Sequence, residues 1–292
     1  MKIIDLINQG GQFISLEFFP PKSRSDWPVF FQTVQRLATL KPLFASVTYG
    51  AGGSTNADSL EIVTRLQNEF NLETMAHLTC IGSTPEEIHA FLNSLTDAGV
   101  TNVLALRGDL PQEQGEVPAL SSTLQHGSDL VSLIKNAFPA MGICAAAYPE
   151  THPEATSTEA DRAFLKLKLD NGADCAITQL FFDNNLYHTF VQQSREAGIT
   201  RPILPGILPV VSLKVIKRII SLCGASIPKD FLSQLEEADR TGGAAAVQKI
   251  GIAHARTQIR ELLASGVAGV HIYTLNRAEV VFELLEGIEL GQ

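Results

Sequence analysis

Short apolar runs rich in β-forming residues alternate along the chain with longer segments in which apolar residues recur with helical period. Several runs, such as AITQLFF, are apolar at nearly every position, which favours parallel strands covered on both faces. The segments between the runs predict helices over Trp27–Leu40, Pro85–Ala98, Thr158–Asn171, Asn184–Ala197 and Leu213–Leu222. The runs themselves predict eight strands: Phe13–Phe19, Phe44–Thr48, Thr74–Thr79, Asn102–Leu106, Gly142–Ala147, Asp174–Thr178, Ile203–Ile207 and Val270–Tyr273.

Eight repeats of strand and helix are typical of one α/β fold, the (β/α)₈ or TIM barrel. The long interval between Ile207 and Val270 holds two further helical patterns, over Pro228–Glu236 and Gly243–Ala264. We interpret them as extra helices before the last strand, within a single domain spanning residues 1–292. An open doubly wound sheet is the alternative. However, the glycine-rich segment at 50–55 lacks the third glycine of a dinucleotide-binding turn, and the chain contains no P-loop motif.

Composition and charge restrict the partners that the protein can have. Apolar residues make up 45% of the 292 residues and charged residues 18%, so we expect a large core and no intrinsic disorder. The net charge of −9 argues against nucleic acid or an anionic membrane as a partner. No apolar run approaches the roughly 18 residues of a membrane helix, and polar residues interrupt the amino-terminal segment before a signal-peptide core can form. We therefore expect a cytoplasmic protein.

The four cysteines are widely spaced and form no CxxC pair. This spacing argues against a cysteine metal site or a redox motif. We expect reduced and mostly buried thiols.

Polar residues follow the predicted strands at the ends where a barrel of this kind carries its active site. Almost every predicted strand has such a residue at or just beyond its carboxyl end, so we expect these side chains to meet at one mouth of the barrel. They are Glu17, Thr48, His77, Arg107 to Asp109, Tyr148 with Glu150 and His152, Gln179, and Tyr273 with Arg277.

Glu17 is the most informative of these residues because it stands inside an apolar run, where a carboxylate is costly unless it is paired or used in chemistry. It has two interpretations: a structural ion pair with Arg107 or another cation, or a general acid whose pKa an apolar environment raises toward neutrality. Asp109 is a candidate second carboxylate, although Arg-Gly-Asp in a loop is also typical of a turn.

Metal and Schiff-base chemistry are less favoured by the same residues. His77 and His152 lack the spacing of a zinc-binding helix, and no lysine interrupts a predicted strand. We expect no metal. A metal-dependent aldolase or lyase that uses His77, His152 and a carboxylate remains an alternative.

Eight short motifs, in order along nearly the whole chain, resemble those of the methylenetetrahydrofolate reductase family. They are SLEFFPPK (15–22), SVTYGAGGST (46–55), HLTC (77–80), ALRGDLP (105–111), AAYPETHPEA (146–155), AITQLFFD (176–183), PGILPV (205–210) and HIYTLNRA (271–278). The family has a (β/α)₈ barrel, in agreement with the strand pattern. The length resembles the catalytic domain alone, without the regulatory domain of eukaryotic relatives.

The resemblance implies a flavin-dependent oxidoreductase of one-carbon metabolism and methionine biosynthesis. Noncovalently bound FAD would take a hydride from NADH or NADPH and reduce 5,10-methylenetetrahydrofolate to 5-methyltetrahydrofolate. Glu17 would protonate the folate nitrogen, and Asp109 would stabilise the cationic intermediate. Gln179, Leu213, Tyr273, Leu275 and Arg277 would bind substrate. The residues implied for FAD are Thr48, His77, Arg107, Gly108, Asp109, Tyr148, His152, Asp161 and Lys168.

Two positions depart from the family pattern: Asn56 stands where an arginine is frequent, and Leu213 stands where an aromatic residue is usual. A non-catalytic flavin- or folate-binding subunit of a larger complex is a further alternative. We expect a homo-oligomer, although the sequence fixes neither the number of subunits nor the choice between NADH and NADPH.

Overall fold

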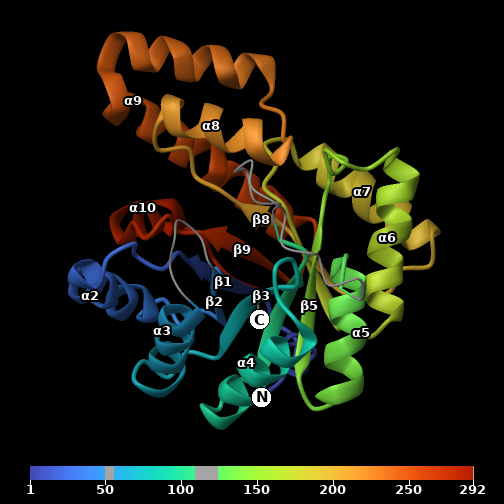
Figure 1. The fold of residues 1–292 in the computed structure, drawn as a ribbon. Coiled ribbons are helices and arrows are strands. Elements are labelled where there is room, and N and C mark those ends of the chain that lie inside the picture. Colours follow the sequence, from blue (N-terminus) through green and yellow to red (C-terminus); the bar gives the residue numbers. More distant parts are fainter. Residues whose placement is uncertain (50–55, 109–123, 292) are drawn as a thin grey trace, which may run out of the picture.

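The computed structural model describes residues 1–49, 56–108 and 124–291 and folds as a barrel of parallel strands surrounded by helices (Figure 1). The strands follow one another around the barrel in the order β7-β6-β5-β4-β3-β2-β1-β9-β8. All eight pairings are parallel. The strands are β1 (Phe13–Phe18), β2 (Ala45–Val47), β3 (Thr74–Thr79), β4 (Asn102–Leu106), β5 (Gly142–Ala147), β6 (Cys175–Thr178), β7 (Ile203–Leu204), β8 (Gly206–Ile207) and β9 (Gly269–Tyr273). The predicted fold class is confirmed.

The predicted strand Ile203–Ile207 is divided at Pro205, which has no N–H to donate to a ladder. Its first half, β7, pairs with β6, and its second half, β8, pairs with β9. The carbonyl of Pro205 still accepts a hydrogen bond from the His271 N–H at 2.9 Å, and the Gly206 N–H donates to Thr178 Oγ1 at 2.9 Å. The segment therefore joins the two edges of the sheet and nearly closes the barrel.

Helices cover the outside of the barrel, as the amphipathic segments predict. The five predicted helices all form and begin at the predicted residues, and their carboxyl-terminal ends differ from the predicted ones by one or two residues. The helices are α1 (Ile3–Ile7), α2 (Trp27–Ala38) after the 3₁₀ turn η1 (Arg24–Asp26), α3 (Asn56–Asn68), α4 (Pro85–Asp97), α5 (Gly127–Ala137), α6 (Thr158–Asp170), α7 (Asn184–Glu196), α8 (Leu213–Cys223), α9 (Lys229–Ala264) and α10 (Ala278–Leu285).

The extra helical material before the last strand is confirmed, but its division differs from the prediction. The first predicted helix extends beyond Glu236 and meets the second directly at Gly243, where the backbone leaves the helical region at φ 62° and ψ −156°. Only glycine adopts this conformation readily, so the bend falls there. Together with α8, the first half of α9 rises above the barrel in Figure 1, and the second half returns to the barrel, where Ile252, Ile259 and Leu262 join the main core. Their facing sides pack through Phe231, Leu235 and Val247.

Alternation along β1 explains how the barrel interior is filled. Ile14, Leu16 and Phe18 face the covering helices, whereas Phe13 packs inside the barrel. The amino-terminal end of the interior is closed by α1, whose Ile3 and Ile7 belong to the same inner cluster. By the same alternation, Ser15 and Glu17 lie on the inward side of β1, above Phe13.

The expectation of reduced thiols is wrong for two of the four cysteines. Cys144 of β5 and Cys175 of β6 are register partners on neighbouring strands and form a disulfide. The two cysteines are 31 residues apart and form no sequence motif. The pairing of β5 with β6 brings them together. Cys80 and Cys223 are free thiols, and burial raises the pKa of both.

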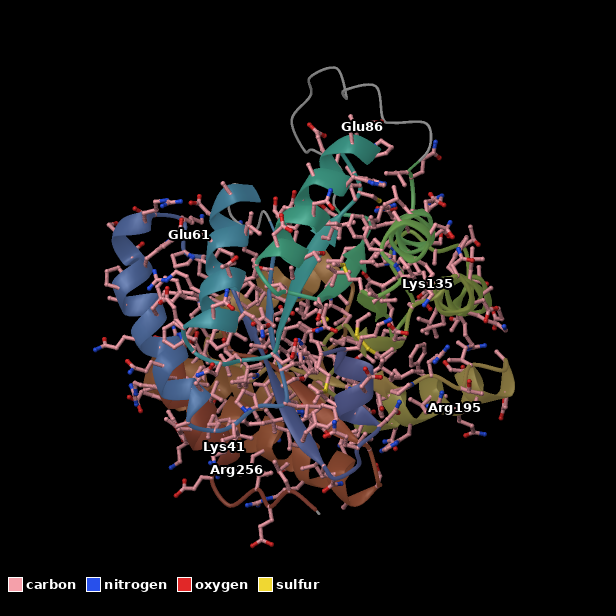
Figure 2. The ribbon with its side chains drawn as sticks, turned by 90° about the horizontal axis from the view of Figure 1, so that it is seen from below. Lys41, Glu61, Glu86, Lys135, Arg195 and Arg256 are labelled. Atoms are coloured by element: carbon pink, nitrogen blue, oxygen red, sulfur yellow. A yellow bond between two sulfur atoms is a disulfide. The ribbon has the colours of Figure 1, made fainter. Side chains whose placement is uncertain are left out.

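Charged side chains labelled in Figure 2, including Lys41, Glu61 and Arg195, lie at the periphery of the molecule. None of the helices in the described ranges is both long and apolar enough to cross a membrane. The carboxylate of Glu17, which is buried in the barrel interior, is an exception to this peripheral placement of charge.

Candidate active site

Glu17 lies inside the mouth of the barrel with only 5% of its surface exposed. In the sheet register it is the partner of Ser46 on β2 and of Tyr273 on β9, so residues from both neighbouring strands surround it. Its Oε2 accepts a hydrogen bond from Ser46 Oγ at 3.4 Å and lies 3.3 Å from His77 Nε2 and 3.4 Å from His271 Nε2. The structure therefore brings together two predicted site residues, Glu17 and His77.

The pKa of Glu17 is shifted in the direction opposite to the expectation. Burial alone would raise this pKa, but the neighbouring imidazoles of His77 and His271 outweigh burial and lower it from 4.5 to about 2. The carboxylate is therefore ionised in this arrangement. Its neighbours are two histidines and Ser46 rather than Arg107, whose guanidinium binds Glu154.

Sequence reasoning did not single out Ser15, Ser46 and His271, which complete the network around Glu17. His271 is fully buried, and its Nδ1 lies 2.8 Å from Ser15 Oγ while its Nε2 faces Glu17. The sequence did contain a signal for this network. Ser15 and Glu17, two residues apart, share one face of a strand, and so do His271 and Tyr273. Their pairing could not be read without the register of β1 with β9.

The loop that follows β9 holds the end of β1 in place. Thr274 Oγ1 donates to the carbonyl of Glu17 at 2.6 Å. Asn276 binds both backbone groups of Phe19, accepting from its N–H at 3.1 Å and donating to its carbonyl at 2.7 Å. Leu275 and Asn276 adopt left-handed conformations, with φ of 48° and 56°. Because these conformations are unfavourable for side-chain-bearing residues, the bonds to β1 stabilise a strained turn. Arg277 follows as an exposed residue before α10.

Tyr273 reaches from β9 over Gly206 to β6, where its hydroxyl donates to the carbonyl of Thr178 at 2.8 Å. Burial raises its pKa well above the usual value, so the hydroxyl stays protonated. Gly206 makes this crossing possible, because a Cβ there would lie 2.8 Å from the Tyr273 ring and hydroxyl.

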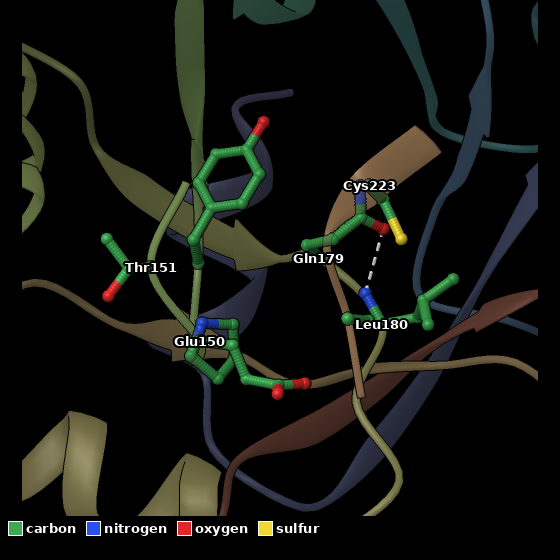
Figure 3. Close-up of a pocket in the computed structure, with 8 residues that line it drawn as sticks. Glu150, Thr151, Gln179, Leu180 and Cys223 are labelled. Carbon is green, nitrogen blue, oxygen red and sulfur yellow. Dashed lines mark hydrogen bonds between the residues drawn. The ribbon is translucent and has the colours of Figure 1, made fainter. Parts of the chain in front are cut away.

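Gln179 lies at the end of β6 and lines a pocket with residues of the β5–α6 loop and the end of α8 (Figure 3). Its side-chain oxygen accepts from the Leu180 N–H at 2.9 Å, as the dashed line in Figure 3 shows. Glu150, on the opposite wall, accepts from the N–H and hydroxyl of Ser226 and so ties this wall to the segment after α8. The predicted substrate residue Gln179 thus shares a pocket with Tyr148 from the predicted cofactor set.

Several residues of the predicted cofactor set contact one another around β5 and α6. Asp161 accepts from the His152 N–H at 2.9 Å, and the ring of His152 meets that of Tyr148 edge-on at 4.6 Å between centroids. Lys168 donates to the Ala146 carbonyl at 2.6 Å. Burial lowers the pKa of Lys168 to about 8, against the opposing effect of Asp161.

The end of β4 carries Arg107 and Gly108. Gly108 has a φ of +89°, and a Cβ there would lie 3.0 Å from the Cβ of Thr79, so the position suits only glycine. The guanidinium of Arg107 binds the carboxylate of Glu154. Asp109 and the side chain of Asn56 lie outside the described residues.

Two buried polar atoms at the mouth, Thr48 Oγ1 and His77 Nε2, have no hydrogen-bond partner among the described residues. The His77 nitrogen is close to Glu17 without the alignment of a hydrogen bond. Buried polar atoms normally have partners, so a polar ligand at this place would satisfy them. Both residues belong to the predicted FAD set, and a flavin ring, with its polar edge, fits this requirement.

Leu213 is the first residue of α8, half-buried against the apolar cluster shared by α8 and α9. Across the described ranges of the chain, no group of three or more His, Cys, Asp or Glu side chains is arranged to hold a metal ion.

A parallel (β/α)₈ barrel with a buried ionisable network at the carboxyl ends of its strands has the architecture of a TIM-barrel enzyme. The family model for methylenetetrahydrofolate reductase matches residues 2–289. The chain is 38% identical to 5,10-methylenetetrahydrofolate reductase of Escherichia coli over 276 residues, covering 94% of this chain and 90% of that protein. This chain belongs to the methylenetetrahydrofolate reductase family, as its motifs indicate.

A plant relative extends well beyond the matched region. Methylenetetrahydrofolate reductase (NADH) 1 of Arabidopsis thaliana is 38% identical over 290 residues, which cover 94% of this chain and 49% of that protein. The chain therefore spans about half the length of the plant relative.

Solved structures support the barrel fold at low sequence identity. A Clostridium thermocellum protein, described as binding two copies of 5-methyl-5,6,7,8-tetrahydrofolic acid, superposes with a TM-score of 0.67 at 15% identity and covers 96% of this chain and 95% of its own. A 2,3-dimethylmalate lyase gives a TM-score of 0.53 at 10% identity, over 97% of this chain and 82% of its own. At these identities the likeness shows the fold alone.

Proposed function

We propose that this chain reduces 5,10-methylenetetrahydrofolate to 5-methyltetrahydrofolate with hydride from NADH or NADPH, using FAD. Family membership supports the reaction. The observation that carries the proposal is the buried carboxylate of Glu17 at the mouth, together with the buried Thr48 Oγ1 and His77 Nε2, which have no hydrogen-bond partner among the described residues. The Clostridium thermocellum neighbour is described as binding the same methylated folate that this reaction would produce.

FAD would be held by Thr48, His77, Arg107, Gly108, Asp109, Tyr148, His152, Asp161 and Lys168. When bound, FAD supplies the chemistry of hydride transfer. The cations Arg107 and Lys168 are suited to its diphosphate, because guanidinium and ammonium groups bind phosphate oxygens strongly. Thr48 and His77 are suited to polar atoms of the flavin ring.

Glu17 is proposed to donate a proton to the folate nitrogen, and its ionised state must first change. If His77 turns its Nε2 to the cofactor, one of the two imidazoles that lower the Glu17 pKa is withdrawn, and burial then raises that pKa. His271 would stay anchored to Ser15, with its Nε2 3.4 Å from Oε2 of Glu17. Binding of the cofactor would thus raise the Glu17 pKa and allow its carboxyl group to hold the proton that it donates.

The substrate would be bound by residues from the strand ends and the loops beyond them. Gln179 is proposed to bind the pterin edge, and Arg277 the glutamate carboxylates of folate. Leu213, Tyr273 and Leu275 are proposed as apolar and ring contacts. Asp109 is proposed to stabilise the cationic intermediate.

The choice of nicotinamide stays open, because relatives named for NADH and for NADPH match this chain at 38% and 36% identity. A homo-oligomer and a single catalytic domain over residues 1–292 remain predictions from the sequence.

The absorption spectrum of the purified protein tests the proposal. A yellow protein that NADH or NADPH bleaches without oxygen, and that methylenetetrahydrofolate then reoxidises, supports the reductase. A colourless protein that carries a metal supports the lyase. A yellow protein that reacts with neither nicotinamide supports the non-catalytic subunit.

A further inference from the structure

The guanidinium of Arg107 is bound by an internal carboxylate at the place where an anionic ligand is proposed to bind. Both terminal nitrogens of Arg107 contact Glu154, at 2.5 Å from Nη1 to Oε2 and 2.7 Å from Nη2 to Oε1. Arg107 follows β4, and Glu154 lies in the β5–α6 loop, 47 residues later. The pair therefore links the loops that follow two neighbouring strands, β4 and β5.

The backbone around Glu154 connects this carboxylate to other residues of the proposed cofactor site. Its own N–H donates to His152 Nδ1 at 3.1 Å, and the N–H of His152 donates to Asp161. The side chain of Glu154 is 56% exposed, whereas that of Arg107 is 27% exposed. The carboxylate can therefore leave the guanidinium for solvent while its backbone stays in place.

A carboxylate and a phosphate bind the guanidinium fork with the same paired hydrogen bonds. A diphosphate that approaches Arg107 must displace Glu154 and is also repelled by its charge. We propose that Glu154 is an internal competitor for the anionic ligand, which occupies the Arg107 guanidinium in the ligand-free protein and weakens the binding of FAD. This inference rests on the proposed function insofar as the ligand is FAD.

A pair elsewhere in the molecule provides a matched control. Arg65 and Glu69 also form a two-bond contact, from Nε and Nη2 at 2.9 Å for each bond, but they lie one turn apart at the carboxyl end of α3, where Glu69 directly follows the last helical residue. Glu69→Gln and Glu154→Gln remove the same charge from the same type of pair. An exposed pair contributes little to stability, so both variants should fold.

The test is titration of the full-length apoprotein with FAD, followed by quenching of flavin fluorescence, and separately with inorganic pyrophosphate, followed by calorimetry. Glu154→Gln should bind FAD and pyrophosphate about three- to tenfold more tightly than wild type at low ionic strength. The gain should shrink with added salt, because screening weakens the repulsion. Glu69→Gln should bind both as wild type does.

Unchanged or weaker binding of both probes by Glu154→Gln would overturn the inference and would show instead that Glu154 positions Arg107 or plays no part. If no variant binds FAD, the proposed function fails, and pyrophosphate decides the inference by itself. Tighter pyrophosphate binding in Glu154→Gln then supports the competitor role, and equal binding refutes it. The variant Glu154→Asp, which keeps the charge on a shorter side chain, should gain less than Glu154→Gln.

Discussion

Glu17 and His77 come within 3.3 Å of each other from strands that are not neighbours, because β2 lies between β1 and β3. Such contacts arise in these barrels because side chains from alternate strands share one interior layer. The relationship has two consequences. It keeps the carboxylate ionised in the ligand-free protein, and it links the proposed acid to a residue of the proposed cofactor site.

The lowered pKa of Glu17 predicts how stability depends on pH. A carboxyl group whose pKa falls on folding, here from 4.5 to about 2, stabilises the fold above the unfolded-state value. This contribution, on the order of 3 kcal/mol, is lost as the pH falls through that window. Urea unfolding of wild type and Glu17→Gln should therefore give a difference in unfolding free energy that is full near neutrality and shrinks below about pH 4.5. A difference independent of pH would show that the histidines do not stabilise the carboxylate.

The turn after β9 is predicted to position Glu17. Asn276→Gly keeps the left-handed backbone but removes both hydrogen bonds to Phe19, so it should cost about 1–3 kcal/mol of stability. Because a displacement of the acid of about 1 Å slows chemistry strongly, folate reduction should fall roughly tenfold or more while flavin reduction by nicotinamide is kept.

Asn71 offers the control for this change, since it also has a positive φ, 51°, in the turn between α3 and β3. Asn71→Gly should leave both half-reactions unchanged. Equal slowing of both half-reactions in Asn276→Gly would assign the turn a general structural role instead.

Asp109 is predicted to act through its charge. Asp109→Asn should make the flavin easier to reduce, because a nearby negative charge disfavours added electrons, and it should slow hydride delivery to the cationic folate intermediate. A redox titration would show a higher midpoint potential than in wild type. An unchanged or lower potential would place this carboxylate away from the ring and favour the turn interpretation.

The repeating pattern of apolar runs was sufficient to predict the barrel and most of its strands, because buried parallel strands have a distinctive composition. Details that depend on single backbone groups were not predictable in the same way. The missing N–H of Pro205 divides a strand that reads as continuous, and Gly243 bends two helices at their junction.

The candidate site was only partly readable from sequence, for a physical reason. The position of Glu17 inside an apolar run indicated its importance, but the direction of its pKa shift depends on His77 and His271. Only the register of four strands, β9, β1, β2 and β3, brings these histidines close. The disulfide of Cys144 and Cys175 was missed in the same way. Contacts across the sheet leave no trace in local spacing.

The most direct measurement of the central claim, that Glu17 is the acid of a flavin-dependent folate reductase, is anaerobic stopped-flow absorbance of the flavin in wild type and Glu17→Gln. The variant should bind FAD and be bleached by NADH or NADPH at the wild-type rate. Its reoxidation by methylenetetrahydrofolate should be slower by roughly 10² or more, the usual contribution of a general acid. Equal slowing of both half-reactions, or reoxidation at the wild-type rate, would contradict the account and leave Glu17 as a structural partner of His77 and His271.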